Sequence, residues 1–427
     1  MMLRKVFPSD LKGCINAPPS KSYAHRALIL SAFRKKSTFI HNPGDNEDIK
    51  ATINSLRALG AEFSQNGSDV LFSEYDNGNI KDEIVNVDVG ESGSTFRFIL
   101  PLILVLGKKA NVICHGRLKE RPHDYFFNEL REHGAEIESI PSGFKVFGKL
   151  QGDTYTIDST ISSQYITGLL LSLPYLNREC RITLKGESVS KSYLNITEDV
   201  LNKTGVNYSY SHNTYTVNGF SNSSHNSIFV EGDWSGASFF IVAGALSKDG
   251  IKVSSLNPAS VQGDAQIIDI VRKFGAQVDV SSDDVFVKKG SKINPVSVNL
   301  DNMIDSVPIL SVLASFANGV SEFSGIERLK YKESDRIRSV TDMLSSSGIK
   351  AEYKNKRLYI HGGEPHSGVF NGVNDHRIVM SASILASYVN DNNPSYVSTP
   401  DAVKKSYPGF FEDLKTIGGE SCVKVDR

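Results

Sequence analysis

Apolar segments of helical length, each opened by a short polar turn, recur six times along the chain at intervals of about 70 residues. They are SKSYAHRALILSAF from Ser20, ESGSTFRFILPLIL from Glu91, SSQYITGLLLSL from Ser162, DWSGASFFIVAGAL from Asp233, DSVPILSVLASFA from Asp305 and DHRIVMSASILA from Asp375. A fixed period of this length indicates one folding unit used repeatedly. The six polar turns therefore predict six comparable helix N-termini, and helix N-termini bind anions.

A glycine that ends a second helix keeps the same period. The spacings are 74, 71, 70, 73 and 70 residues between Gly60, Gly134, Gly205, Gly275, Gly348 and Gly418. A glycine just past a helix end can take the left-handed conformation that terminates the helix. The second helices are expected at 48–59, 125–133 and 267–274, among others.

Short β-rich stretches fill the rest of each period. Examples are 37–41, 110–114 and 181–184, and the pairs 61–64 with 70–73 and 276–280 with 285–288. The paired strands are joined by short polar turns, which predicts hairpins in a mixed sheet. Each unit is thus predicted as αβαββ, with one more strand leading into it.

Six such units exceed one small core, so two similar domains of three units each are expected. The expected domains are residues 19–231, and residues 1–18 together with 232–427. The strand-like stretch Arg4–Phe7 would pair back into the second of these. Pro18-Pro19 would form a stiff crossover, and the segment before Gly232 the matching one.

Composition excludes several classes of protein. The 427 residues are 40% hydrophobic, and 47 basic against 48 acidic residues give a net charge of −1, so neither a nucleic-acid nor a membrane partner is expected. The N-terminus has no apparent signal peptide, and the longest apolar run, Phe96–Leu106, reads as a buried helix. Four scattered cysteines without CxxC and ten histidines without ligand spacing favour a reducing, cytoplasmic location and no metal site.

Cations recur in the first turns of these helices, where they oppose the helix dipole. Lys21 and Ser22 follow the possible cap Ser20, and Arg26 lies on the same face as Ser22. A bound phosphate or carboxylate would explain them; an exposed lysine beside an ordinary cap is the alternative. The further candidate motifs are Gly90–Thr95 with Gly93, followed by Arg97; Arg117–Pro122 with Arg121; Ser162-Ser163-Gln164; and Ser190–Tyr193.

The C-terminal half repeats this pattern with carboxylates added. Asp305 opens the fifth helix, and the segment 330–336 places Glu333, which could exchange a proton, between Lys332 and Arg336. The other motifs are Asp375-His376-Arg377 and Lys404–Pro408, which contains Lys405. Each alone could be a cap or a solvated loop. Together, at one phase of the repeat, they indicate one or two highly anionic ligands in a cleft between the domains, because unpaired buried cations are costly. The fourth turn, 233–235, contains no cation, and a hinge role is expected for it.

Eight motifs run in a fixed order over nearly the full length: KSYAHR, SGSTFR, RLKERP, SSQY, SKSY, KESDR, NDHR and KKSYPGF. In this order they resemble the 5-enolpyruvylshikimate-3-phosphate (EPSP) synthase family. The resemblance implies a two-domain inside-out α/β barrel, with three βαβαββ repeats in each domain and the active site in the interdomain cleft. It also implies a monomer that acts on small molecules in aromatic amino acid biosynthesis, without a metal or organic cofactor.

The implied reaction transfers the carboxyvinyl group of phosphoenolpyruvate to the 5-hydroxyl of shikimate 3-phosphate and releases phosphate. By resemblance, shikimate 3-phosphate would be bound by Lys21, Ser22, Arg26, Ser162, Ser163, Gln164, Ser190, Tyr193, Asp305 and Lys332. Phosphoenolpyruvate would be bound by Lys21, Gly93, Arg121, Gln164, Arg336, Arg377 and Lys405. The implied catalytic groups are Asp305, which takes the hydroxyl proton, and Lys21 and Glu333, which serve the methylene carbon.

Two positions depart from the family pattern. Glu91 replaces an asparagine often found there, and Phe98 stands where many members have proline or leucine. Both flank Gly93, so the response to glyphosate stays open.

Two other functions compete with this interpretation. The sister enolpyruvyl transferase, which acts on UDP-N-acetylglucosamine, has Lys-Asn where Lys21-Ser22 stand here. It commonly carries a reactive cysteine five residues before the loop arginine, where this chain has Gly116; Cys114 is out of register. A non-enzymatic repeat scaffold would tolerate any polar residue at each helix start, whereas cations recur here.

Overall fold

The computed structural model describes the whole chain except residues 1, 76–82, 187–188, 222–225, 421–422 and 427. The chain divides into two compact units, one formed by residues 19–231 and the other by residues 1–18 with 232–427. Each unit has its own apolar core. Within the described part of the chain, no helix combines the length and apolar character needed to cross a membrane.

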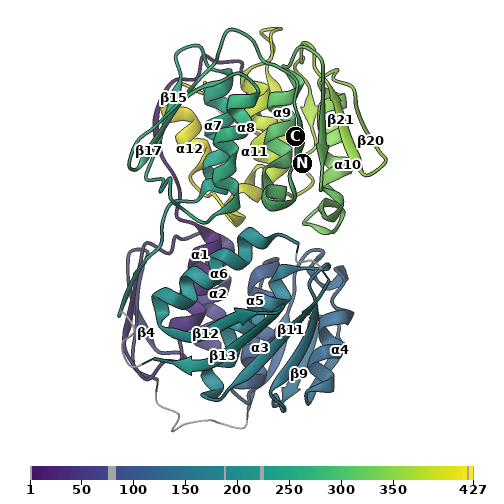
Figure 1. The fold of residues 1–427 in the computed structure, drawn as a ribbon. Helices are drawn as coiled ribbons and strands as arrows, with labels where there is room; N and C mark the ends of the chain where they lie inside the picture. The colour runs from purple at the N-terminus through teal and green to yellow at the C-terminus, as the bar shows by residue number, and fades with distance from the viewer. Residues whose placement is uncertain (1, 76–82, 187–188, 222–225, 421–422, 427) are drawn as a thin grey trace. The chain divides into compact units, whose positions relative to one another are not determined.

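Three helices lie at the centre of each unit and are buried on almost every side. In the unit 19–231 they are α1 (Lys21–Ser31), α3 (Gly93–Val105) and α5 (Ser163–Ser172). In the other unit they are α7 (Trp234–Leu246), α9 (Val307–Ser315) and α11 (His376–Ser387). These are the six apolar segments of the repeat, and the strands lie outside them (Figure 1). A helix that is apolar all round is expected in such a position.

Each of the six second helices packs against at least one strand of its unit. They are α2 (Glu47–Ala58), α4 (Asp124–Glu132), α6 (Lys191–Thr204), α8 (Ile267–Lys273), α10 (Arg336–Ser346) and α12 (Phe410–Thr416). The three predicted by range agree within one residue at each end. The glycines that follow all six have φ between 72° and 99°, which confirms the predicted left-handed helix ends.

Each unit carries three four-stranded sheets of one pattern, in which a parallel pair is extended by an antiparallel pair. In the unit 19–231 the first sheet has the order β14 (Ser227–Phe229), β3 (Thr38–His41), β5 (Asp69–Phe72), β4 (Phe63–Asn66). The second has β6 (Ile84–Asp88), β7 (Lys109–Ile113), β9 (Gly143–Gly148), β8 (Ala135–Ile140). The third has β10 (Thr154–Asp158), β11 (Cys180–Lys185), β13 (Thr214–Phe220), β12 (Val206–Ser211).

The other unit repeats the pattern with help from the N-terminal strands. Its first sheet has the order β2 (Gly13–Asn16), β15 (Ile251–Ser254), β17 (Asp284–Lys288), β16 (Gln277–Val280). The second has β18 (Ser297–Asn299), β19 (Val320–Ser324), β21 (Arg357–His361), β20 (Ala351–Lys354). The third has β22 (Val369–Phe370), β23 (Ser395–Ser398), β1 (Met2–Val6), β24 (Val423–Asp426). The expected return of the N-terminal strand to this part of the chain is confirmed, because β1 pairs with β23.

The fifth repeat begins differently from the prediction. Asp305 does not open α9 but lies in a 3₁₀ segment, Asp301–Ser306, and α9 starts at Val307. Met303, at φ −139° and ψ 42°, interrupts the helical geometry of that segment. Pro308 favours a helix start at this point, because proline has no N–H to donate and its fixed φ suits the first turn.

One hydrogen bond occurs at matching positions in both units. The hydroxyl of Tyr175 donates to the carbonyl of Ile29 at 2.6 Å, and that of Tyr388 donates to the carbonyl of Ala243 at 2.7 Å. Both tyrosines follow the third core helix of their unit and reach back to the first. These bonds tie together the C-terminal ends of the core helices, away from the ends that carry the cations.

Candidate active site

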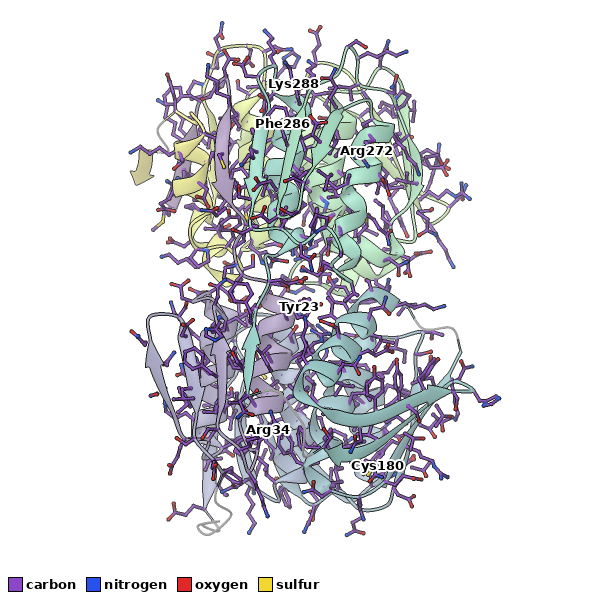
Figure 2. All side chains as sticks on the ribbon, turned by 60° about the vertical axis from the view of Figure 1, so that its left-hand side comes forward. Tyr23, Arg34, Cys180, Arg272, Phe286 and Lys288 are labelled. Atoms are coloured by element: carbon purple, nitrogen blue, oxygen red, sulfur yellow. The ribbon has the colours of Figure 1, made fainter. Side chains whose placement is uncertain are left out.

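The first turns of five helices meet in the unit 19–231. Lys21 of α1 reaches Asp48 of α2, and Ser94 of α3 reaches Gln164 of α5. Arg26, in the second turn of α1, donates to the carbonyl of Tyr193 in the first turn of α6. Figure 2 shows Tyr23 in the first turn of α1 and Arg34 beyond the other end of the helix, so the polar first turn lies far from Arg34. Gathered helix N-termini create a positive potential that favours anions.

Lys21 is held by an ion pair that the sequence did not indicate. Its Nζ donates to Oδ2 of Asp48 at 2.7 Å, and the exposed fractions of the two side chains are only 18% and 12%. Asp48 is fixed in the first turn of α2, where Asn46 caps the helix through Ile49. Ser20 is the N-cap residue of α1, as predicted, but its hydroxyl makes no capping hydrogen bond. Instead the Ser20 N–H donates to the carbonyl of Glu231 at 2.8 Å, so the adjacent crossover segment fixes this turn.

Arg26 is a buried cation surrounded by neutral groups. It donates to the hydroxyl of Thr197 at 2.9 Å and to the carbonyls of Ser22 and Tyr193 at 2.7 and 3.1 Å. In the described part of the chain, none of its hydrogen-bond acceptors is a carboxylate. Its guanidinium also lies 5.3 Å from the ring centre of Phe98, one of the two departures from the family pattern. Burial lowers the pKa of Arg26 to about 10, as expected for a cation without a counterion.

Gly93 lies directly against two arginines. A methyl group at this position would come within 2.6 Å of Nη1 of Arg121 and 3.0 Å of Nη1 of Arg97. Arg97 also donates to Oε1 of Gln164, whose Nε2 donates to Ser94 at 3.0 Å. Arg121, Gln164 and Gly93 were predicted as one group and do lie together. Arg97 was noted only as a first-turn cation, although the phase of the repeat could have included it.

The loop that carries Arg121 is fixed by two aromatic residues that the sequence analysis did not select. The hydroxyl of Tyr165 donates to the carbonyl of Pro122 at 2.7 Å. Nε2 of His123 lies 2.8 Å from the carbonyl of Leu118, so this nitrogen carries the proton. Burial, with a contribution from Arg97, lowers the pKa of His123 to about 3. The imidazole is therefore a neutral structural donor at neutral pH.

The remaining predicted residues of this unit lie at helix starts. The hydroxyl of Ser162 caps α5 by accepting from the N–H of Gln164 at 3.3 Å, and Ser163 is buried beside it. Ser190 precedes α6 in a left-handed conformation, with φ 53°. The carbonyl of Tyr193, in the first turn of α6, accepts from Arg26.

In the other unit, Arg336 collects three carboxylates. Its Nη1 donates to Asp305 at 2.6 Å, its Nη2 to Glu333 at 2.6 Å, and its Nε to Asp375 at 2.8 Å. The side chain of Arg336 is only 2% exposed. Burial alone would lower the pKa of Arg336, but the three carboxylates together raise it above its ordinary value. The sequence placed Glu333 and Arg336 in one motif but gave no sign of the bond to Asp375.

Asp305 is strongly held in its ionised form. Nζ of Lys332 lies 3.1 Å from the same Oδ1 that accepts from Arg336. Burial raises the pKa of Asp305, but Lys332, Arg336 and Arg377 outweigh this effect and hold it well below its usual range. Asp305 is thus a weak base as long as these partners stay in place.

Arg377 and Lys405 complete the predicted cations of this unit. Nη1 of Arg377 donates to the carbonyl of Ser235 at 3.0 Å, while its Nε is buried without a hydrogen-bond partner among the described residues. Nζ of Lys405 donates to the carbonyl of Asn374 at 2.8 Å. The fourth polar turn, which has no cation, therefore supports Arg377 through Ser235.

Asp264 is a buried acid that the sequence analysis missed. It accepts a 2.6 Å hydrogen bond from Ser306, the residue after Asp305. Burial, together with the charges of Asp305 and Asp233, raises its pKa to about 6, against the opposing effect of Arg377. No motif marks this residue, because it lies in a short 3₁₀ segment, Gly263–Gln266, far from Asp305 in sequence.

The structure accounts for Cys114, which bears on the sister reaction, and for Glu91, which departs from the family pattern. Cys114 follows strand β7, and burial raises the pKa of its thiol to about 12, so it is not a reactive thiolate. The carboxylate of Glu91 lies against Gly116, where a methyl group would come within 2.7 Å of it.

A cavity lies at the opposite end of the core helices in each unit. One, of about 290 Å³, is lined by Phe33, Arg34 and Tyr175; the other, of about 470 Å³, by Leu246, Lys248 and Tyr388. Carbonyl groups at helix C-termini attract cations, so these basic residues have a structural explanation there. Neither cavity includes a predicted site residue.

Comparisons with known proteins agree with these observations. A family model described as EPSP synthase (3-phosphoshikimate 1-carboxyvinyltransferase) matches residues 7–414. The 3-phosphoshikimate 1-carboxyvinyltransferases of Clostridium novyi and Clostridium kluyveri are 34% and 35% identical to this chain, and each match covers 97% of both chains. A solved structure of EPSP synthase from Acinetobacter baumannii matches over 100% of both chains with a TM-score of 0.81 at 22% identity, which confirms the expected fold. The chain belongs to the EPSP synthase (3-phosphoshikimate 1-carboxyvinyltransferase) family.

Proposed function

We propose that this enzyme transfers the carboxyvinyl group of phosphoenolpyruvate to the 5-hydroxyl of shikimate 3-phosphate and releases phosphate. The observation that carries the proposal is the set of cations at helix N-termini, above all Arg26, which is buried among neutral acceptors. A buried cation of this kind needs an anionic ligand. The two substrates together carry two phosphates and two carboxylates.

The binding residues divide between the substrates as the family resemblance implies. Shikimate 3-phosphate is assigned to Lys21, Ser22, Arg26, Ser162, Ser163, Gln164, Ser190, Tyr193, Asp305 and Lys332. Phosphoenolpyruvate is assigned to Lys21, Gly93, Arg121, Gln164, Arg336, Arg377 and Lys405. The close grouping of Gly93, Arg121 and Gln164 supports the second set, because two guanidinium groups there lie beside a glycine that leaves room for them.

The chemistry follows from the electron-rich double bond of phosphoenolpyruvate, which is an enol phosphate. Glu333 or Lys21 gives a proton to the methylene carbon, which makes the neighbouring carbon electrophilic. The 5-hydroxyl adds there as Asp305 takes its proton, and a tetrahedral ketal forms. Loss of a proton from the methyl group and of phosphate then gives the product. The cations stabilise the charges that develop, and they do so best where water is excluded.

An assay of phosphate release tests this function. We expect release that requires both substrates and falls strongly in Lys21→Met. No release above that variant would contradict the proposal, and release with UDP-N-acetylglucosamine in place of shikimate 3-phosphate would favour the sister reaction.

We also expect the enzyme to act in the cytoplasm as a monomer, without a nucleic-acid or membrane partner. The net charge of −1 supports the absence of polyanionic partners. The described cysteines, Cys14, Cys114 and Cys180, are free thiols, which fits a reducing compartment.

A further inference from the structure

Arg336, assigned above to phosphoenolpyruvate, already has its guanidinium bound to protein carboxylates. Asp305 accepts from Nη1 and Glu333 from Nη2, each at 2.6 Å. Asp375 accepts from Nε at 2.8 Å and from Nη2 at 3.1 Å. A substrate carboxylate can therefore reach this guanidinium only by replacing one or more of these partners.

Asp375 is held in place by hydrogen bonds in addition to its ion pair with Arg336. Its side chain is fully buried, and it also accepts from the hydroxyl of Ser334 at 2.9 Å and from the N–H of Arg377 at 3.0 Å. The second of these bonds caps α11. Moving Asp375 would break the cap and leave a buried carboxylate unpaired, which is strongly destabilising.

Asp305 and Glu333 are the two partners that can move. The exposed fractions of their side chains are 16% and 18%, against 0% for Asp375, so these two partners are the more accessible ones. They occupy Nη1 and Nη2, two donors of the planar fork that matches a carboxylate. Asp375 therefore stays bound to Nε, whereas Asp305 and Glu333 can be displaced from Nη1 and Nη2.

We propose that Arg336 exchanges carboxylates during binding: the carboxylate of phosphoenolpyruvate takes Nη1 and Nη2, while Asp305 and Glu333 are released and Asp375 stays bound. This inference rests on the proposed function. Its consequence is that the two groups assigned to proton transfer gain affinity for protons only when the substrate is present. Arg336 pairs with both carboxylates, and it helps to hold the pKa of Asp305 well below its usual range.

The surroundings of the released carboxylates favour proton uptake. Once the substrate neutralises Arg336, Asp305 keeps Lys332 at 3.1 Å and the more distant charge of Arg377. Asp264 and Asp375 contribute negative charge on the same side. Glu333 keeps the nearby charge of Lys332 but loses its direct ion pair with Arg336, so the affinity of its carboxylate for a proton rises and we expect it to take up a proton from solvent. During turnover that proton passes to the methylene carbon, and the hydroxyl proton passes to Asp305 as the C–O bond forms.

Proton-linked calorimetry measures the exchange directly. Phospholactate is a suitable probe, because it has the carboxylate and phosphate of phosphoenolpyruvate without the reactive double bond. It would be titrated at pH 7 into the enzyme saturated with shikimate 3-phosphate, in buffers of different ionisation enthalpy. We expect net proton uptake in the unmodified enzyme, and loss of that uptake with binding retained in Glu333→Gln.

Glu322→Gln is the matched control. Glu322 also pairs with an arginine, Arg357, but it lies on strand β19 outside the Arg336 cluster. This variant should keep the uptake of the unmodified enzyme. Binding with equal proton uptake in the unmodified enzyme and in Glu333→Gln would overturn the exchange, even if turnover is normal. If neither turnover nor binding occurs, the proposed function fails and this inference fails with it.

Discussion

Lys21 donates a 2.7 Å hydrogen bond to Asp48, a residue of the next helix, and both side chains are mostly buried. Arg336 and Asp305 form the corresponding pair in the other unit, at 2.6 Å. In both units, then, a cation assigned to substrate is paired with a carboxylate of the protein. Such a pair keeps a charged group stable at a helix N-terminus, where the dipole alone would oppose it. It also fixes the position of the cation before substrate arrives.

Asp48→Asn should weaken catalysis by disturbing Lys21. The amide can keep a contact but carries no charge, so Lys21 loses its ion-pair partner. A hydrogen bond between charged groups contributes about 1.5–3 kcal/mol, so we expect kcat/KM to fall about 10- to 100-fold. Steady-state assays with each substrate varied in turn would measure this.

Asp45→Asn is the control for Asp48, because Asp45 lies just before the same helix in an exposed pair, 3.9 Å from Lys50. It should change kcat/KM little. Equal activities in the two variants would show that the Lys21–Asp48 pair has no part in catalysis.

Gly93→Ala should raise the KM for phosphoenolpyruvate more than the KM for shikimate 3-phosphate. The added methyl group would come within 2.6 Å of Arg121 and 3.0 Å of Arg97, so at least one guanidinium must move. A displacement on the order of 1 Å at a binding group can cost about 100-fold. Separate KM measurements for the two substrates would reveal the asymmetry.

Gly363→Ala provides a comparison for the same change. At Gly363 a methyl group meets only Ile349, at an ordinary 3.5 Å. This variant should leave both KM values near those of the unmodified enzyme. An equal rise in both KM values for Gly93→Ala would argue against a local effect on phosphoenolpyruvate.

The fold was predictable because its signals are local and repeated. Six apolar helices and six terminal glycines recur at one period, and each glycine is needed for a left-handed helix end. The start of α9 was misplaced, because both Asp305 and Pro308 are good helix openers and only packing decides between them.

The cations of the site could be predicted from the sequence, but some of the acidic residues around them could not. Lys21 and Arg377 stand in the first turn of a core helix, and Arg121 and Arg336 stand at or just before the start of a second helix, which are positions that the repeat displays. Asp48 and Asp264 are two of 48 acidic residues, and no local pattern separates them from the rest. Their bonds join residues 27 and 42 positions apart and depend on how neighbouring helices are rotated, which side-chain packing determines.

The unit 19–231 should lose stability below about pH 6.5, the ordinary pKa of histidine. Burial lowers the pKa of His25 well below that value and that of His123 to about 3. The unfolded chain therefore binds protons that the folded chain does not, so the free energy of unfolding falls as the pH falls from 6.5 toward 3. Between pH 7.5 and 5.5 each histidine should contribute a loss of about 1.4 kcal/mol. Urea unfolding at the two pH values measures it.

His123→Phe should reduce the loss of unfolding free energy between pH 7.5 and 5.5 by about 1.4 kcal/mol, the contribution of one histidine. The ring fits among Phe96, Phe127 and Phe144, although the bond to Leu118 is lost. His212→Asn, at an exposed turn, should leave the dependence unchanged. A pH dependence identical in all three proteins would exclude His123 as its source.

Asp264→Asn should stabilise the other unit at pH 7.5. Burial raises the pKa of Asp264 to about 6, so ionising this carboxyl group requires more free energy in the folded protein than in the unfolded chain. The effect of pH on the free energy of unfolding has the opposite sign to that of the histidines. The destabilisation by Asp264 begins above about pH 3.8 and is complete above about pH 6. The asparagine oxygen can still accept from Ser306. We expect the free energy of unfolding at pH 7.5 to rise by about 1–3 kcal/mol and the gain to disappear near pH 4. Thermal unfolding across this range measures both, and a gain that persists at pH 4 would mean that packing, rather than ionisation, is responsible.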